Sequence, residues 1–489
     1  MHKKMGLLVI AVLVLAQTYS YGQSWRFTGE ISSSRRHMRA NVLLNGSVLI
    51  TGGNDNMNTS LTTCELFDPA TEKWTETQGM KTPRFQHTTH VLSDGRVVAI
   101  AGYNDGMMVS SVEIYDPTAG TWSDGGMIIT ARMNHTSILL QNGKILIVGG
   151  FDGSDFLKLC ELYDPATKSS VAAGSLKLGR HDHNAILLKS GKVLITGGRV
   201  GGADGVYLNE AELYDPTTDA WTVINPMNSS RIIGTLVEFS DETVLAAGGR
   251  ATANNATQSA DLFDPVSQTW TATSPMKEPR HWQGESLMPN DRYLITGGIK
   301  DADWASNNVV QVSNTCEWYD KALKSWYYAP DLNFDRSQHD QVFFTQDGNT
   351  NLPKECVMVI GGIRTGVSVL TSTCEVLDVS DKQVQGYMMS PRNTTQSVKN
   401  SDVDGVVRIV NNATASPVLI FTDKADVQNT KIDLVNEQGL LISSIDFAKS
   451  GFTAQRYPLD SKNLANGLYF LRIRSNGNST KVLKLLIAK

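Results

Sequence analysis

The chain has 489 residues, 41% hydrophobic and 19% charged, with a net charge of −5 at pH 7. This is a globular composition, and the length allows two or three domains. The acidic balance implies no basic face, so we expect no nucleic-acid partner.

Residues 1–22 have the pattern of a secretory signal peptide. Two lysines near the start precede an apolar run at residues 6–16, which is too short to span a bilayer. Small residues Ser20 and Gly22 predict cleavage between Gly22 and Gln23. We find no later segment suited to a transmembrane helix and expect a secreted or cell-surface protein.

Residues 23–392 repeat one pattern seven times, at intervals of about 48 residues. Each unit has an arginine, an apolar strand that ends in small residues, usually two glycines, and an acidic–aromatic strand such as CELYD. Asn-Gly and Asp-Gly pairs predict tight hairpins between the first two strands. One four-stranded sheet leaves its faces exposed, whereas seven sheets arranged radially bury them against one another.

This pattern, in which a glycine pair precedes an aromatic residue and then a tryptophan, resembles the kelch repeat. The resemblance implies an all-β fold, with a seven-bladed β-propeller at residues 23–392. Units three and seven depart from it, with Ser170 and Val384 in the tryptophan position, and unit two has Ala101 for the first glycine.

The seventh unit therefore has a weak outer strand. Trp25 precedes Arg35 with the spacing that separates Trp74 from Arg84, so we expect the N-terminal segment to supply this strand and close the ring. Residues 383–389 are the alternative.

Each unit carries one arginine and one acidic residue. A buried carboxylate costs about several kcal/mol unless it is paired, so we interpret them as scaffold ion pairs. A ring of arginines that binds an anion is the alternative. The pairs are Arg35 with Glu65, Arg84 with Glu113, Arg132 with Glu161, Arg180 with Glu212, Arg231 with Asp261, Arg280 with Glu317, and Arg336 with Glu375.

Four units have a histidine three residues after the arginine. A metal site in the central channel is conceivable, but Met38, Gly234 and Gln283 interrupt the ring, so we predict a structural role and no metal. The histidines are His87, His135, His183 and His339.

The chain has five cysteines, an odd number. Four share one position in the acidic–aromatic strands of different units, so we expect buried thiols. A Cys356–Cys374 bridge is the one pairing considered, although its register looks imperfect. The four equivalent cysteines are Cys64, Cys160, Cys316 and Cys374.

Residues 393–404 are polar and predict a linker. Residues 405–489 contain about seven alternating strands, which predict a small antiparallel sandwich. The ending GLYFLRIRSNGNSTKVLKLLIAK resembles the type A sorting domain of the type IX secretion system of Bacteroidetes. That resemblance implies an Ig-like β-sandwich recognised by the type IX secretion machinery; a carbohydrate-binding sandwich is the alternative. The matching residues are Gly467, Tyr469, Arg472, Lys481, Lys484 and Lys489.

Loops between second and third strands should share one face of the propeller with the segments that connect units. The longest such loop, in unit six, contains a tryptophan among carboxylates, a combination typical of sugar sites. We therefore expect a ligand between units four and six. The candidate ligand-binding residues are Trp304, Trp282, Asp301, Asp303, Arg280, His281, His181 and Asp182.

We predict a binding module for a glycan or a protein, without catalytic residues or a cofactor. The alternative is a carbohydrate-active enzyme similar to the kelch-class sugar epimerases and mutarotases. A copper oxidase resembling galactose oxidase is less favoured, because no tyrosine precedes a histidine and no histidine follows His339.

Overall fold

A computed structural model describes residues 24–201, 205–252, 255–300, 311–345, 355–365 and 370–380, together with seven strands beyond residue 406. The chain separates into one compact unit of residues 23–390 and a second unit that contains residues 391–489. The expected signal peptide and linker lie outside the described residues.

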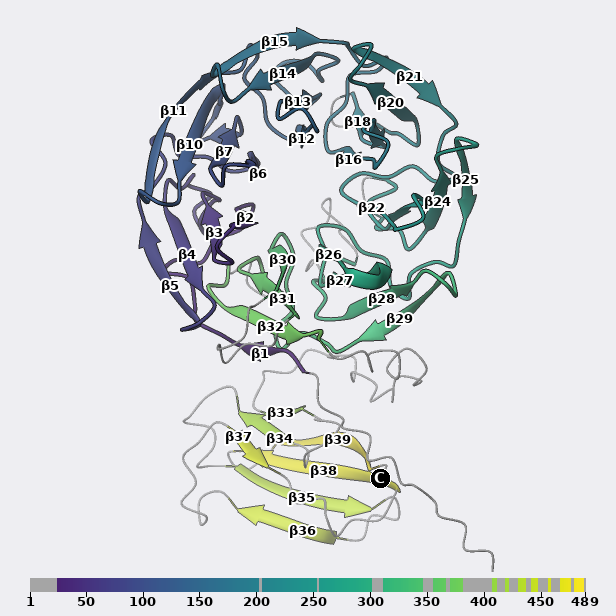
Figure 1. Cartoon of the computed structure of the whole chain (residues 1–489). Coiled ribbons are helices and arrows are strands. Elements are labelled where there is room, and N and C mark those ends of the chain that lie inside the picture. The colour runs from purple at the N-terminus through teal and green to yellow at the C-terminus, as the bar shows by residue number, and fades with distance from the viewer. Residues whose placement is uncertain are drawn as a thin grey trace, which may run out of the picture. The chain divides into compact units, whose positions relative to one another are not determined.

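The first unit is a ring of seven four-stranded antiparallel sheets, with the first strand of each blade at the centre and the last at the rim (Figure 1). This confirms the predicted seven-bladed propeller. Blades one to three contain β2 (Arg39–Val42), β3 (Val48–Thr51), β4 (Cys64–Asp68) and β5 (Lys73–Thr77); β6 (Thr88–Val91), β7 (Val97–Ile100), β10 (Ser111–Asp116) and β11 (Thr121–Met127); and β12 (Thr136–Leu139), β13 (Ile145–Val148), β14 (Cys160–Asp164) and β15 (Ser169–Ala173).

Blades four to six follow the same order. They contain β16 (Asn184–Leu187), β17 (Val193–Thr196), β20 (Ala211–Asp215) and β21 (Ala220–Ile224); β22 (Thr235–Glu238), β23 (Val244–Ala247), β24 (Ala260–Asp264) and β25 (Thr269–Ala272); and β26 (Gly284–Met288), the 3-10 turn η1 (Pro289–Asp291), β27 (Arg292–Thr296), β28 (Cys316–Asp320) and β29 (Ser325–Ala329). Two loop hairpins pair β8 (Tyr103–Asn104) with β9 (Met107–Met108), and β18 (Arg199–Val200) with β19 (Val206–Tyr207).

The hydrophobic core lies between neighbouring blades. Every residue of β13, with the sequence ILIV, is buried. Ile147 of this strand packs in one cluster with Val98 of blade two. A strand that is apolar at every position is stable here because sheets cover both of its faces.

The glycine pairs join each blade to the next. Gly149 and Gly150 have φ angles of 57° and 98°, and a Cβ on Gly149 would lie 2.6 Å from the carbonyl oxygen of Arg180. The N–H of Gly150 donates to that same carbonyl at 2.8 Å. The equivalent bond recurs at all seven joints, and Gly362 to Arg35 at 2.9 Å links the last blade to the first.

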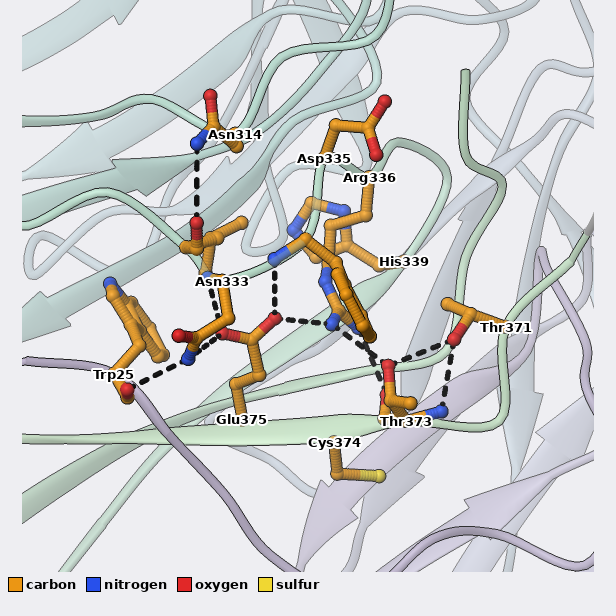
Figure 2. A network of polar contacts seen from close by, with 12 residues as sticks. Trp25, Asn314, Asn333, Asp335, Arg336, His339, Thr371, Thr373, Cys374 and Glu375 are labelled. Atoms are coloured by element: carbon orange, nitrogen blue, oxygen red, sulfur yellow. Dashed lines mark hydrogen bonds and ion pairs between the residues drawn. The ribbon is translucent and has the colours of Figure 1, made fainter. Parts of the chain in front are cut away.

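Blade seven confirms closure by the N-terminal segment. It contains β30 (Asp340–Thr345), β31 (Glu355–Ile360), β32 (Cys374–Asp378) and, as its outer strand, β1 (Arg26–Phe27). Trp25 is 3% exposed, and its indole N–H donates to the carbonyl of Pro330 at 2.9 Å. Asn333 donates to the carbonyl of Trp25 at 2.7 Å (Figure 2). The alternative at residues 383–389 falls outside the part of the chain that the structure describes.

All five cysteines are buried, as predicted. The register of β31 and β32 places Cys356 opposite Asp378 and Cys374 opposite Ile360, so these two do not form a bridge. Burial raises the pKa of the Cys64 thiol to about 11, so it stays protonated and acts as a small apolar side chain.

The second unit contains seven described strands in two antiparallel sheets. One sheet has the order β33 (Val407–Val410), β34 (Val418–Phe421), β37 (Arg456–Pro458). The other has the order β36 (Leu441–Asp446), β35 (Thr430–Asn436), β38 (Gly467–Ser475), β39 (Ser479–Ile487). Within the described part of the chain, no helix is long and apolar enough to cross a membrane.

Candidate functional site

Each blade contains the predicted arginine–acid pair, and together these pairs form what we call the scaffold ring. In blade three, Arg132 is fully buried, pairs with Glu161 and donates to the carbonyls of Gly149 and Leu159 at 2.8 and 2.9 Å. Glu161 also accepts from the backbone N–H of Thr130 at 3.0 Å. The arginine therefore fastens three segments of its own blade.

The other six pairs have the same geometry. In blade seven, Arg336 bonds Glu375 at 2.6 Å and Thr373 at 3.1 Å, and Asn333 and Phe334 donate their N–H groups to the same carboxylate (Figure 2). All seven arginines are 0% exposed. The scaffold interpretation is confirmed, and the arginines have no surface from which to clasp an anion.

The repeated histidines form hydrogen bonds between neighbouring blades. His135 Nε2 lies 3.1 Å from the Thr88 hydroxyl of the preceding blade, and His183 Nε2 lies 2.8 Å from that of Thr136. His87 with Thr51 and His339 with Thr296 repeat this contact at 2.9 Å. Burial lowers the pKa of these four imidazoles well below the usual value, so they are neutral.

The segments that enter each blade lie beside the loops that follow the glycine pairs. The residue after each arginine forms a β-bridge to the residue after the glycine pair, as in Arg36 with Asn54 and His281 with Ile299. The next residue has a left-handed backbone in every blade, with φ between 52° and 54°. These seven residues form what we call the mouth ring: His37, Gln86, Asn134, Asp182, Ile233, Trp282 and Gln338.

The mouth ring surrounds one cavity at the centre of the propeller. Its volume is about 460 Å³, and all seven mouth-ring residues line it. Backbone bonds join neighbouring members: Gln338 N–H donates to the carbonyl of Trp282 at 3.0 Å, and Ile233 N–H to that of Asp182 at 3.1 Å. The ring is thus a rigid frame that carries side chains of different chemistry.

The structure brings only some of the predicted ligand residues to this cavity. Trp282 and Asp182, from blades six and four, both line it. Arg280 and His281 are 0% exposed; Arg280 bonds Glu317, and His281 Nδ1 lies 3.1 Å from the Ile299 carbonyl. Arg280 and His281 therefore belong to the scaffold. Trp282 has a left-handed backbone, and of these three consecutive residues it is the one whose side chain lines the cavity.

Of the remaining predicted residues, the structure describes His181, which is not among the residues that line the cavity. His181 stacks on Phe156 at 4.8 Å and lies 3.0 Å from the Asp182 carboxylate. Asp301, Asp303 and Trp304 lie outside the residues that the structure describes. Sequence reasoning missed the other five mouth-ring residues. No sequence signal singled them out, since the position one residue after each arginine varies as widely as the position two residues after it.

Below the mouth, the channel wall carries one exposed carboxylate. Glu285 of β26 accepts a hydrogen bond from the Tyr293 hydroxyl and lines the cavity together with Arg39. Enclosure by the surrounding blades, with a smaller contribution from the negative charge of Asp340, outweighs the lowering effect of the Tyr293 hydrogen bond and raises the pKa of Glu285 to about 7. This carboxyl can hold or release a proton near neutral pH.

Comparisons with known proteins agree with the two units. The kelch motif matches residues 35–81, 84–126, 132–176 and 189–228, and the secretion system C-terminal sorting domain matches residues 413–488. No curated protein sequence matches the chain significantly.

One similar solved structure is a fungal alcohol oxidase of the AA5 family in complex with copper. It shares 14% identity, with a TM-score of 0.58, over 95% of this chain and 100% of that one. That likeness concerns the fold. The described residues of this chain contain no group of three or more His, Cys, Asp or Glu side chains able to hold a metal.

The seven repeats and the matched C-terminal segment agree on one identification. The chain is a kelch-repeat seven-bladed β-propeller with a C-terminal sorting domain of the type IX secretion system, through which it reaches the cell surface or the medium.

Proposed function

We propose that the propeller is a binding module whose mouth takes a glycan. The observation that carries this proposal is Trp282, a half-buried indole at the edge of a cavity otherwise lined largely by polar side chains. An aromatic ring stacks on the apolar face of a sugar, and amide and carboxylate groups bond its hydroxyls. Asn134 and Asp182 supply such groups from the facing blades.

The proposal also assigns roles to the two ends of the chain and to the long loop of blade six. Residues 1–22 act as the signal peptide, cleaved near Gly22, and residues 405–489 form an Ig-like sandwich that the secretion machinery recognises. Asp301, Asp303 and Trp304 extend the site from the loop of blade six. A protein ligand at the same mouth is the alternative occupant.

A glycan array followed by calorimetry on the full chain tests this function. Trp282→Ala should weaken glycan binding by about 1–3 kcal/mol, as expected for an anchoring aromatic residue. Met127→Ala is the control, since Met127 is 62% exposed on the outer strand β11. A glycan that both variants bind like the parent protein would place the site away from the mouth.

A second candidate function is proton transfer on a bound sugar, as in an epimerase or mutarotase. It is favoured by Glu285, whose pKa of about 7 suits a general acid or base at neutral pH. NMR exchange spectroscopy on reducing sugars should then show faster anomer exchange with the full chain. Glu285→Gln should abolish the acceleration, and equal rates with and without protein would eliminate this activity.

A further inference from the structure

A second cavity lies beside the mouth on the same face, over blades one and two, and we call it the side groove. Its volume is about 570 Å³. The mouth and the side groove share His37 and Gln86, so the two cavities adjoin each other at these residues. The side groove is also lined by Arg36, Asn54, Met57, Asn58, Thr59, Phe85, Tyr103, Asp105 and Gly106.

Aromatic rings run without interruption from the mouth into the side groove. The ring of Trp282 lies 6.2 Å from that of His37, His37 stacks on Phe85 at 5.9 Å, and Phe85 meets Tyr103 edge-on at 5.3 Å. Burial and the neighbouring Arg36 lower the pKa of His37 to about 3, so its imidazole is neutral. The series therefore offers uncharged ring surface along its whole length.

The walls of the side groove are held in place by bonds across the boundary between blades. Asp105 accepts from the N–H and hydroxyl of Ser60 at 2.8 and 2.9 Å, which ties the loop of blade two to that of blade one. Arg36 donates to Gln338 of the mouth ring at 3.0 Å and to Asn58 at 2.6 Å. The Arg36 guanidinium thus holds wall residues of both cavities in place.

An exposed apolar side chain stands at the rim of the side groove. Met57 is 86% exposed, yet its turn is ordered by Asp55, which accepts from the N–H groups of Met57 and Thr59 at 2.8 and 2.9 Å. A flexible thioether adapts readily to an apolar ligand face. The lining has one cationic and one acidic side chain, Arg36 and Asp105, so it favours a neutral ligand over a charged peptide.

Each cavity alone has a size typical of a small-molecule site, which is about 300–1,000 Å³. We propose that mouth and side groove are two subsites of one site for an extended neutral oligosaccharide, with His37 at their junction. This inference rests on the proposed glycan-binding function and adds that the ligand is a chain rather than a single sugar.

The test measures, by calorimetry on the full protein, how affinity depends on the number of sugar units in the ligand. The probes are four series of oligosaccharides, derived from xylan, cellulose, starch and chitin, and each series, or ladder, runs from one to six sugar units. For the ladder that binds, we expect affinity to rise with length and then level off. Tyr103→Ala with Met57→Ala should lower the affinity of the longest member about tenfold and leave that of the shortest unchanged, whereas Trp282→Ala should weaken both.

The possible failures can be told apart. Equal affinity for short and long members, still dependent on Trp282, would confine the ligand to the mouth and overturn the two-subsite proposal alone. Length-dependent affinity that ignores Tyr103 and Met57 would overturn it as well. If no ladder binds, or if charged peptides compete with the sugars more strongly than sugars do with one another, the glycan function itself fails.

Discussion

The scaffold ring and the mouth ring are two residues apart in sequence and behave in opposite ways. Arginine fills the first position in all seven blades, is 0% exposed in each and always meets a carboxylate. The second position has the same left-handed backbone in all blades but holds six different residue types. The repeated arginine–carboxylate pairs thus hold each blade together, and the varied residues two positions later form the candidate binding site.

Acid is the broadest way to break the scaffold, and it acts at the mouth as well, because His135, His183 and His339 also line that cavity. The four repeated histidines have folded pKa values well below 6.5, so the unfolded chain binds protons that the folded chain excludes. Their stabilisation is complete above about pH 6.5 and declines as pH falls, by up to about 1.4 kcal/mol per pH unit for each histidine. Urea unfolding at pH 7.5, 6.5 and 5.5 should therefore show a loss of several kcal/mol.

His135→Gln provides the matched variant for this pH effect, because Gln283 fills the same position in blade six. His37, His90 and His281 also have lowered pKa values, so the variant should reduce the pH dependence by about one seventh if the seven histidines contribute alike. Stability that stays constant between pH 7.5 and 5.5 would contradict the neutral, buried state of these rings.

Removing one scaffold arginine should have the next largest effect. Arg132→Ala leaves Glu161 buried without its partner, and we expect a loss of about 3–5 kcal/mol in urea unfolding. Arg96→Ala is the control, since Arg96 pairs with Asp94 at the surface and should cost at most about 1 kcal/mol. The double change Arg132→Met with Glu161→Leu should recover only part of the loss, because it leaves the carbonyls of Gly149 and Leu159 without their donor. A small effect of the single change would refute a structural role.

Closure of the ring offers a third and somewhat smaller perturbation. Trp25→Ala removes a buried ring from the core of blade seven and should cost about 3 kcal/mol. Phe27→Ala is the comparison, because Phe27 lies on β1, directly after Trp25, is 39% exposed and should cost less. Deleting residues 23–31 should lower the thermal midpoint further, and an unchanged midpoint would argue against closure by β1.

The mouth ring should yield the smallest effect, and with the opposite sign. Ile233 has a φ of 53°, a conformation that is strained for a β-branched residue. Ile233→Asn should therefore stabilise the protein by about 1 kcal/mol in urea unfolding, because asparagine tolerates this backbone. Ile129→Asn, at a 56% exposed position without a left-handed backbone, should show no gain; equal effects of the two would mean that strain is not the cause.

Much of the scaffold could be predicted from the sequence. The blade count, the seven arginine–acid pairs, the thiol state of the cysteines and closure by the segment of Trp25 all follow from spacing. Each depends on a contact that every blade must make in the same way. A period in the sequence is then sufficient evidence of a shared position in space.

The site was less accessible to such reasoning. Arg280, His281 and Trp282 are consecutive, yet only Trp282 reaches the mouth, because its φ of 52° turns the chain there. Nothing in a pattern of non-glycine residues announces a left-handed backbone.

The sequence alone thus determined the repeat and its buried ion pairs, because these depend on local spacing, and its sorting domain, because the C-terminal segment resembles a known family. Only the tertiary structure decided that Trp282 meets His37, and through it Phe85 and Tyr103. Trp282 and His37 belong to blades six and one, and they become neighbours because the ring closes on itself.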